Sequence, residues 1–351
     1  MRRFLTLCTF FLLVFNSVSA QQQQSIPLQF DVSGYSQDQN EAHRFDASSM
    51  DTIPSIKAEM IVNEAGALTY LLPIEVLKGV NSFQPNLALA YNSQSGNGTA
   101  GWGWNIMGLS MITQGGKSKL IDGVTIGVQY DGQDPFYLDG ERLLKVSATT
   151  YVTEKYSKIK ITKQSTGSEF GFIIQYTDGR IAKYKELVPG QYYIATLIDA
   201  LDNEVHYAYN ITSNVPVLTT ISYGGNSAAN DKFFVEFIYN DRTTITKSYR
   251  NGTGYFSSKI LSEIRVKSTY LTANNGLYRK YKLFFDRIQS YTTERLIKIT
   301  VENENGAALK PLKFNYNSAT TGVIESSSSY INNWPFQTIG LGSVVVGDFY
   351  G

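Results

Sequence analysis

Cysteine and histidine are almost absent from this 351-residue chain. The single cysteine is Cys8, and the histidines are His43 and His206, which lie far apart in the sequence. A disulfide or a Cys/His zinc site would need more of these residues. Cys8 lies in the N-terminal apolar run that we interpret below as a cleaved signal peptide, so the mature chain would have no thiolate nucleophile, and neither histidine has the support that a catalytic triad needs. We therefore expect no cofactor, no metal site and no catalytic residue, so that burial and hydrogen bonding must stabilise the fold.

The chain also lacks an excess of charge of either sign. It has 31 Lys+Arg against 30 Asp+Glu, and no basic stripe runs along it. A nucleic-acid partner is therefore not expected. The fingerprints of a P-loop, of dinucleotide binding and of a serine-hydrolase elbow are absent as well.

Long apolar runs are confined to the N-terminus. Met1–Arg3 is positively charged, Phe4–Phe15 is almost wholly apolar, and Val18–Ala20 has the small residues of a cleavage site. This order predicts a signal peptide over residues 1–20, because a membrane span needs about 20 apolar residues. An uncleaved anchor is the alternative. We expect a secreted, extracellular protein without a membrane span after signal cleavage.

Aromatic residues and glycines are abundant, with 24 Tyr, 19 Phe and 29 Gly. Tyr and Phe favour pleated, half-buried strands, and glycines favour the turns between them. Residues 86–92 alternate with period 2, as a strand with one buried face does. The fold class predicted is all-β, with antiparallel hairpins arranged as a meander or as sandwich-like or shell-like sheets.

A loose repeat in the second half predicts β-hairpins. Each unit opens with two aliphatic residues three apart, passes a turn, and closes on an aromatic residue followed by Asn or Asp. The openings begin at Ile194, Leu218, Leu261 and Leu296, and the closings are Tyr209-Asn210, Tyr239-Asn240, Phe285-Asp286 and Tyr316-Asn317. Residues 170–184, which turn at Asp178-Gly179, predict a fifth hairpin.

The organisation predicted along the chain has six parts. They are a signal peptide (1–20), a polar linker (21–57), an N-terminal β region (58–150), a β-hairpin region (151–317), a second linker (318–336) and the start of a propeller-like repeat (337–351). The last part is a lone apolar strand, which cannot bury both of its faces. We therefore expect the chain to be cut at the entrance to a further domain.

Six segments together resemble one known domain. They are 72–74, 85–93, 96–98, Gly101-Trp102-Gly103-Trp104, 108–110 and 136–143. Their order and spacing resemble the N-terminal domain of the Salmonella virulence plasmid protein B (SpvB) family, which also opens the B subunits of insecticidal toxin complexes. The resemblance covers about residues 60–351.

Two further likenesses come with this family. The hairpin region is similar to Rhs-type Tyr-Asp (YD) repeats, which build a hollow β shell around a toxic segment in larger members. Residues 346–351 are similar to the start of a propeller blade, which often binds calcium. Only Asp348 of such a calcium loop is present here, so the resemblance does not support a calcium site.

Three groups of residues could carry chemistry, and each also has a structural interpretation. Trp102 and Trp104 could form an aromatic ledge for a sugar, or they could pack at a turn. Glu302 and Glu304 are spaced like the paired glutamates of ADP-ribosyltransferases, but they lie in an expected hairpin turn. The aspartates do not fit calcium-loop spacing and are expected in surface turns: Asp131, Asp134 and Asp139.

The resemblance and the missing catalytic pattern imply a secreted, non-enzymatic scaffold or interaction module of virulence proteins. Its partner would be a protein, either another toxin-complex subunit or a downstream β shell. The alternatives are a cell-surface glycan-binding module and a truncated toxin that lacks its effector. The residues most specific to the family motif, and therefore candidates for an interaction, are Tyr91, Asn92, Gly101, Trp102, Gly103 and Trp104.

Overall fold

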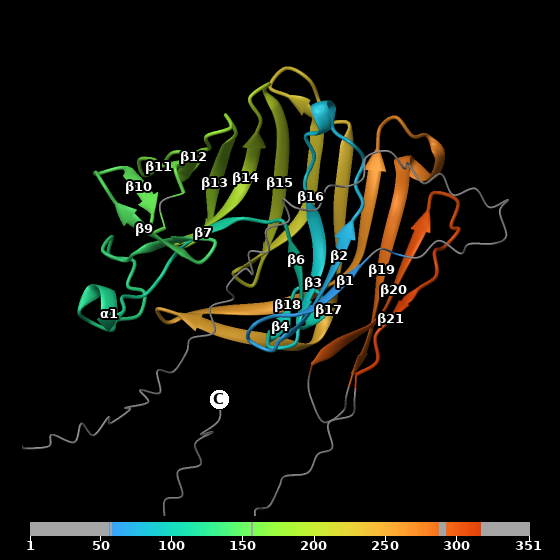
Figure 1. Cartoon of the computed structure of the whole chain (residues 1–351), viewed down its shortest axis with the longest axis horizontal. Coiled ribbons are helices and arrows are strands. Elements are labelled where there is room, and N and C mark those ends of the chain that lie inside the picture. Colours follow the sequence, from blue (N-terminus) through green and yellow to red (C-terminus); the bar gives the residue numbers. More distant parts are fainter. Residues whose placement is uncertain (1–55, 57, 156, 288–292, 317–351) are drawn as a thin grey trace, which may run out of the picture. The chain divides into compact units, whose positions relative to one another are not determined.

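The computed structural model describes residues 56, 58–155, 157–287 and 293–316 (Figure 1). The expected signal peptide, the second linker, the propeller-like start and nearly all of the first linker lie outside these residues. The chain divides into two units, Met1–Phe314 and Asn315–Gly351. The first unit is all-β, as expected from the sequence. None of the helices among the described residues is long and apolar enough to cross a membrane.

Part of the large, 15-stranded sheet closes on itself (Figure 1). One side of β14 pairs with β13, and the other side is divided between β7 and β15. The strands from β7 to β14 therefore form a closed antiparallel barrel. They are β7 (Met111–Gln114), β8 (Phe136–Leu138), β9 (Glu141–Lys145), β10 (Thr150–Thr153), β11 (Lys160–Lys163), β12 (Phe172–Gln175), β13 (Ile181–Val188) and β14 (Gln191–Ile198).

The rest of the large sheet is an antiparallel meander that continues from β14. Its strands are β15 (Asn203–Thr212), β16 (Val215–Asn226), β17 (Phe233–Arg250), β18 (Thr253–Ser268), β19 (Leu277–Arg287), β20 (Glu294–Asn303) and β21 (Leu312–Lys313). Consecutive strands pair with one another, and β12 pairs with β13 in the barrel, so the five hairpins expected from the sequence are confirmed. A 3-10 turn, η3 (Ala273–Gly276), precedes β19.

A second, four-stranded sheet packs against the meander. It contains β1 (Glu59–Val62), β2 (Leu68–Ile74), β3 (Leu87–Asn92) and β6 (Trp104–Met107). The small elements outside the two sheets are β4 (Asn97–Gly98) paired with β5 (Gly101–Trp102), the 3-10 turn η2 (Val80–Ser82) and the helix α1 (Lys119–Asp122). Asn97 and Gly98 pair with Trp102 and Gly101, so β4 and β5 form a minimal hairpin.

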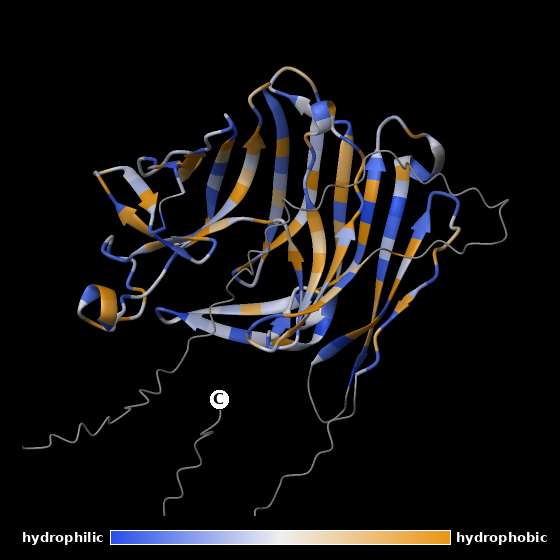
Figure 2. Cartoon of the chain, viewed as in Figure 1, coloured by the Kyte–Doolittle hydropathy of each residue, from blue (hydrophilic) through white to orange (hydrophobic). Residues whose placement is uncertain are grey.

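The two sheets and the barrel share one hydrophobic core. Side chains of β2 and β3, such as Leu72 and Leu89, belong to the same buried cluster as Ile221 of β16 and Val235 of β17. Inside the barrel, the Phe172 ring meets aromatic rings from barrel strands that are not its direct neighbours edge to face, at a centroid distance of 5.0 Å to Phe136. Figure 2 shows the underlying pattern, in which hydrophobic and hydrophilic residues alternate along the strands.

The expected boundary between residues 150 and 151 falls inside β10. The barrel takes β7, β8 and β9 from one side of this position and β11 to β14 from the other. The described residues on both sides belong to one compact unit. Composition changes along the chain did not reveal this, because barrel closure depends on pairings between distant strands.

The hairpin repeat also sets the register of the sheet. At four positions an aromatic residue faces an aliphatic residue where the pairing register shifts by a β-bulge. The pairs are Tyr184 with Ile194, Tyr209 with Leu218, Tyr239 with Leu261, and Phe285 with Leu296. The aromatic closing of one unit thus pairs with the aliphatic opening of the next. Because bulges bend and twist a strand, the repeat curves the sheet at set points.

Candidate functional site

The family motif lies where the small sheet meets the last strands of the large one. Trp104, in β6, is 1% exposed and belongs to the shared core. Its ring centroid lies 6.0 Å from that of Tyr70, 5.4 Å from that of Tyr91 and 4.9 Å from that of Phe314. Phe314 is the last residue of the first unit, so Trp104 fixes the point where the chain leaves this unit.

Trp102 has a different environment. It is 40% exposed, whereas Trp104 is buried, so the two indoles do not form one ledge. The structural interpretation of Trp104 as a packed residue therefore agrees with its position. Asn92 is buried as well, and its side-chain oxygen accepts a hydrogen bond from the Gln94 amide at 2.8 Å, which holds the turn after β3.

The two motif glycines lie where no side chain fits. Gly101 has φ +100°, and a Cβ there would lie 2.9 Å from the carbonyl oxygen of Glu294. Gly103 has φ +76°, and a Cβ there would lie 2.5 Å from the ring of Tyr91. A left-handed backbone favours glycine, and these contacts leave no space for a larger residue. The spacing of the motif thus reflects close packing of the β4–β5 hairpin.

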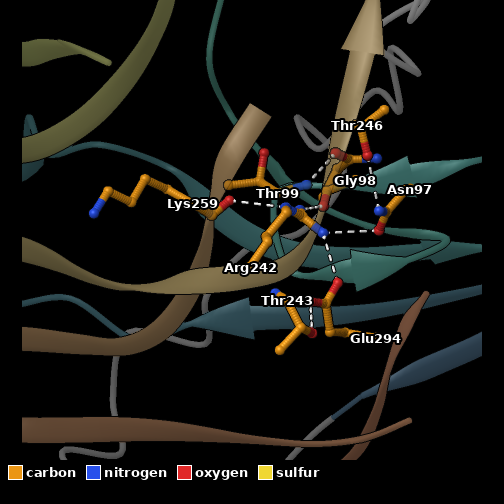
Figure 3. A network of polar contacts seen from close by, with 9 residues as sticks. Asn97, Gly98, Thr99, Arg242, Thr243, Thr246, Lys259 and Glu294 are labelled. Atoms are coloured by element: carbon orange, nitrogen blue, oxygen red, sulfur yellow. Dashed lines mark hydrogen bonds and ion pairs between the residues drawn. The ribbon is translucent and has the colours of Figure 1, made fainter. Parts of the chain in front are cut away.

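A buried arginine fastens this hairpin to the large sheet (Figure 3). Arg242 lies in β17 at a register shift, and its side chain is 1% exposed. Its Nε donates a hydrogen bond to the carbonyl oxygen of Lys259 at 3.0 Å, and its Nη1 donates one to Oδ1 of Asn97 at 2.8 Å. Its Nη2 also donates to the carbonyl oxygen of Gly98. We call Asn97, Gly98, Arg242, Thr243 and Glu294 the hairpin junction.

Glu294, at the start of β20, supplies the negative charge of the junction. Its Oε2 lies 3.3 Å from Nη1 of Arg242, and its side chain is 7% exposed. Its Oε1 accepts hydrogen bonds from the amide of Thr243 at 2.9 Å and from the Thr243 hydroxyl at 2.8 Å. Burial raises the pKa of this carboxyl, but the bonds from Thr243 and the charge of Arg242 outweigh burial and lower the pKa below its ordinary value.

The bulge beside Arg242 is part of the same arrangement. At the Tyr239–Leu261 bulge, the Leu261 amide donates to the carbonyl oxygen of Thr99 at 2.9 Å. Thr99 lies in the turn of the β4–β5 hairpin, so an amide of β18 at the register shift binds the motif. Both the repeat of the large sheet and the motif of the small hairpin are thus needed to build this contact.

A second ionic junction joins the small sheet to β19. Glu75, which follows β2, forms an ion pair with Arg279 and accepts a hydrogen bond from the hydroxyl of Tyr278 at 2.8 Å. Its amide donates to the hydroxyl of Tyr281 at 2.9 Å. The hydroxyl of Tyr223 donates to the carbonyl oxygen of Leu77 at 2.6 Å. Charged and phenolic groups therefore connect segments that are far apart in the sequence.

The other candidate residues are held by local partners. The Glu302 carboxylate contacts the amines of Lys280 at 3.0 Å and Lys282 at 2.8 Å, and Glu304 lies in the turn after β20. His206 is on the opposite strand face from the buried Val205 and Tyr207. His43 lies outside the described residues.

The three aspartates considered for calcium accept hydrogen bonds from different groups of the protein. Asp131 accepts a hydrogen bond from the Gln133 amide, and Asp134 accepts bonds from the amides of Gln129 and Tyr130. Asp139 accepts bonds from the Met111 amide and the Ser110 hydroxyl. Within the described part of the chain, no three His, Cys, Asp or Glu side chains are grouped so as to hold a metal ion.

Comparison with known proteins establishes what this motif belongs to. A sequence model of the family described as "Salmonella virulence plasmid 65kDa B protein" (SpvB) matches residues 62–230. The likeness to SpvB expected from the sequence is confirmed for this region. The match includes every residue of the Gly-Trp-Gly-Trp motif and all the strands of the barrel. It ends before Arg242 and Glu294, so it is shorter than the stretch of about residues 60–351 expected from the sequence.

Solved structures extend the likeness over more of the chain. The N-terminal domain of SpvB from Salmonella typhimurium strain LT2 matches with a TM-score of 0.52 and 17% identity, over 70% of this chain and 98% of that one. The crystal structure of TcdB2-TccC3 matches with a TM-score of 0.60 and 15% identity, over 75% of this chain. The Tc holotoxin pore of Photorhabdus luminescens matches with a TM-score of 0.59 and 16% identity, over 79% of this chain.

This chain covers only 17% of the length of the TcdB2-TccC3 and holotoxin chains. At these identities the likeness shows a shared SpvB-type fold. No protein among the curated sequences matches the chain. The findings together support a toxin-complex-like module.

Sequence reasoning found the motif but missed the charged residues that fasten it. Arg242 and Glu294 are single residues in ordinary strand sequence, and they are 52 positions apart. The signal that could have pointed to Arg242 is its place just after a repeat closing, Tyr239-Asn240, where a bulge occurs.

Proposed function

We propose that this SpvB-type chain is a secreted, non-catalytic scaffold that binds a protein partner in a toxin-complex-like assembly. The observation that carries the proposal is the structural role of the two buried charged residues of the hairpin junction. Arg242 and Glu294 are almost fully buried and contact protein groups of β4, β17, β18 and β20. A catalytic group must face its substrate, whereas these groups fix segments relative to one another.

The edge of the small sheet is the surface we propose for the partner. Among the described residues, β1 pairs only with β2, and all four of its residues are exposed. Met60 is 67% exposed, Ile61 49% and Val62 65%. An exposed apolar edge strand offers free backbone donors and acceptors to a strand of another protein. The likeness to TcdB2-TccC3 and to a Tc holotoxin pore favours a protein as this partner.

A chimera tests the scaffold role. Residues 58–316 would replace the structurally matched part of TcdB2-TccC3, and light scattering with electron microscopy would compare the assembly with the parent. We expect an assembled particle of the parent's form. A chimera whose circular dichroism shows a folded β domain but which does not assemble would contradict the proposal.

A pair of matched variants tests the edge. Ile61→Lys in the chimera should keep the β spectrum and prevent assembly, because a lysine on an edge strand blocks strand addition. Ile211→Lys, at the end of β15, is the control because Ile211 is exposed to a similar extent, 53%. Equal assembly of the two variants would remove β1 as the partner surface.

Secretion is tested separately by sequencing the N-terminus of the protein recovered outside the producing cells. We expect it to begin at Gln21, directly after Ala20. A chain that retains Met1, or that stays inside the cells, would show that the N-terminal segment is not a cleaved signal peptide.

A further inference from the structure

The loop between β7 and β8 presents aliphatic side chains to solvent. We call residues 115–129, which include α1, the α1 loop. Leu120 is 95% exposed, Ile121 53%, Val124 44% and Ile126 42%. Figure 2 shows the hydrophobic colour of this segment on α1, which projects from the barrel. So many exposed aliphatic residues in one short segment mark a contact surface, because scattered single residues are the norm.

The α1 loop is held in this form by several bonds. The guanidinium of Arg142, in β9, binds both carboxylate oxygens of Asp122, at 3.0 and 2.5 Å. Asp122 also accepts a hydrogen bond from the Ser118 amide at 2.8 Å. Lys117 and Ile126 exchange backbone hydrogen bonds at 2.7 and 3.2 Å. The loop that exposes the aliphatic side chains is therefore already ordered, and its backbone loses little conformational entropy on binding.

The charge of the α1 loop is positive once internal pairs are counted. Its charged residues are Lys117, Lys119 and Asp122. Asp122 is paired with Arg142, which leaves the two lysine charges beside the aliphatic tip. Lys119 is exposed next to Leu120. Aliphatic groups flanked by lysines are the composition that binds the interface of an anionic bilayer.

The outer face of β9 continues the apolar surface. Arg142 points outward from β9 to reach Asp122, so Leu144, two residues further, points to the same side. Leu144 is 42% exposed, and Val146, beyond the end of the strand, is 64% exposed. The aliphatic area thus extends from the α1 loop along the barrel wall.

We propose that the α1 loop inserts its aliphatic tip into the surface of a lipid bilayer that contains anionic lipids. The tip is convex, whereas small-molecule sites are concave. The few side chains of the tip also cover less surface than the ~800 Å² per partner that a stable protein interface buries. A bilayer surface accepts such a tip without a matching groove, and its phosphates attract the lysines. This proposal is independent of the β1 edge and of the scaffold role.

The test is sedimentation of the chain without residues 1–20, with vesicles of phosphatidylcholine and phosphatidylglycerol and with vesicles of phosphatidylcholine alone. The chain should bind the anionic vesicles more tightly, and added salt should weaken binding. Leu120→Ser with Ile121→Ser should lower the partition coefficient roughly tenfold, because less apolar surface is buried. Both side chains are exposed, so folding should be unchanged.

Matched variants separate the tip from general stickiness. Leu201→Ser, in the β14–β15 turn, is the control because Leu201 is also well exposed, at 67%. It should leave binding unchanged. Lys117→Gln with Lys119→Gln should reduce the preference for anionic vesicles by about tenfold or more.

Three results would overturn the proposal. One is a wild-type chain that does not sediment with anionic vesicles. Another is equal loss of binding in the Leu201→Ser control. The third is a Leu120→Ser, Ile121→Ser chain that binds vesicles like wild type but changes its mass in analytical ultracentrifugation, which would assign the α1 loop to contacts between copies of the chain.

Discussion

Replacing Arg242 by methionine should destabilise the fold far more than removal of an exposed arginine does. Methionine keeps the length and apolar part of the side chain, but it donates no hydrogen bond. Glu294 then loses its ionic partner while it remains buried, and Asn97, Gly98 and Lys259 lose the donor to their oxygens. The hairpin that carries the Gly-Trp-Gly-Trp motif is released from the large sheet.

The magnitude follows from the burial of the pair. Removal of one partner of a buried ion pair costs about 3–5 kcal/mol, because it leaves an unpaired charge. Glu294 keeps the two hydrogen bonds donated by Thr243, so the lower end of that range, about 3 kcal/mol, applies here. For a unit of this size, a loss of about 3 kcal/mol lowers Tm by roughly 6–12 °C.

Guanidinium unfolding of the chain without residues 1–20, followed by circular dichroism, measures this loss. Arg180→Met is the matched control, since Arg180 is 45% exposed and pairs with Asp178 at 2.7 Å. The control should lose about 1 kcal/mol or less. Arg242→Met combined with Glu294→Met should be more stable than the sum of the single losses, because the unpaired charge is gone. If the free energy of unfolding of the Arg242→Met chain lay within about 0.5 kcal/mol of the wild-type value, the hairpin junction would not stabilise the fold as we argue.

Four more substitutions test the same region. Trp104→Ala should cost about 3–5 kcal/mol in the free energy of unfolding, and Trp102→Ala less than about 1 kcal/mol, because only Trp104 is buried; equal losses in urea titrations would contradict the packing. Gly103→Ala should lower Tm measurably by calorimetry, because its Cβ meets the ring of Tyr91 at a positive φ; an unchanged Tm would show that the ring moves aside. The pKa of Glu294 is lowered by folding, so its contribution to stability is present above its unfolded pKa, near 4.5, and is lost as the pH falls through its folded pKa; Glu294→Gln should flatten this acid limb of the stability curve, and an unchanged acid limb would exclude the carboxylate as its source.

Local patterns in the sequence were sufficient for the strands and hairpins. Alternating residues predicted β3, and turn dipeptides such as Asp178-Gly179 predicted where chains reverse. Closure of the barrel was not predictable in this way, because β7 pairs with β14 some 80 residues away, as in the pair Gln191 and Thr113. Pairings over such separations leave no local periodicity in the sequence.

The candidate site was predictable only in part, for a related reason. Glycine between two tryptophans marks a tightly packed turn, and the packed position of Trp104 follows from that pattern. The position of Trp104 against Phe314 depends on contacts across the whole domain. Arg242 and Glu294 carry no signal in isolation, because any surface strand contains such residues, and only the folded chain brings them together.

The closed barrel also gives the large sheet a direction. An open sheet has two edges, and a strand can join at either one. Here the pairing of β13 with β14 closes one end, so β21 is the outer strand at the other end among the residues that the structure describes. Within that part of the chain, a further strand can extend the large sheet only beyond β21. Growth of this sheet is one-way, and any longer sheet built on this domain must count its strands from the barrel outward.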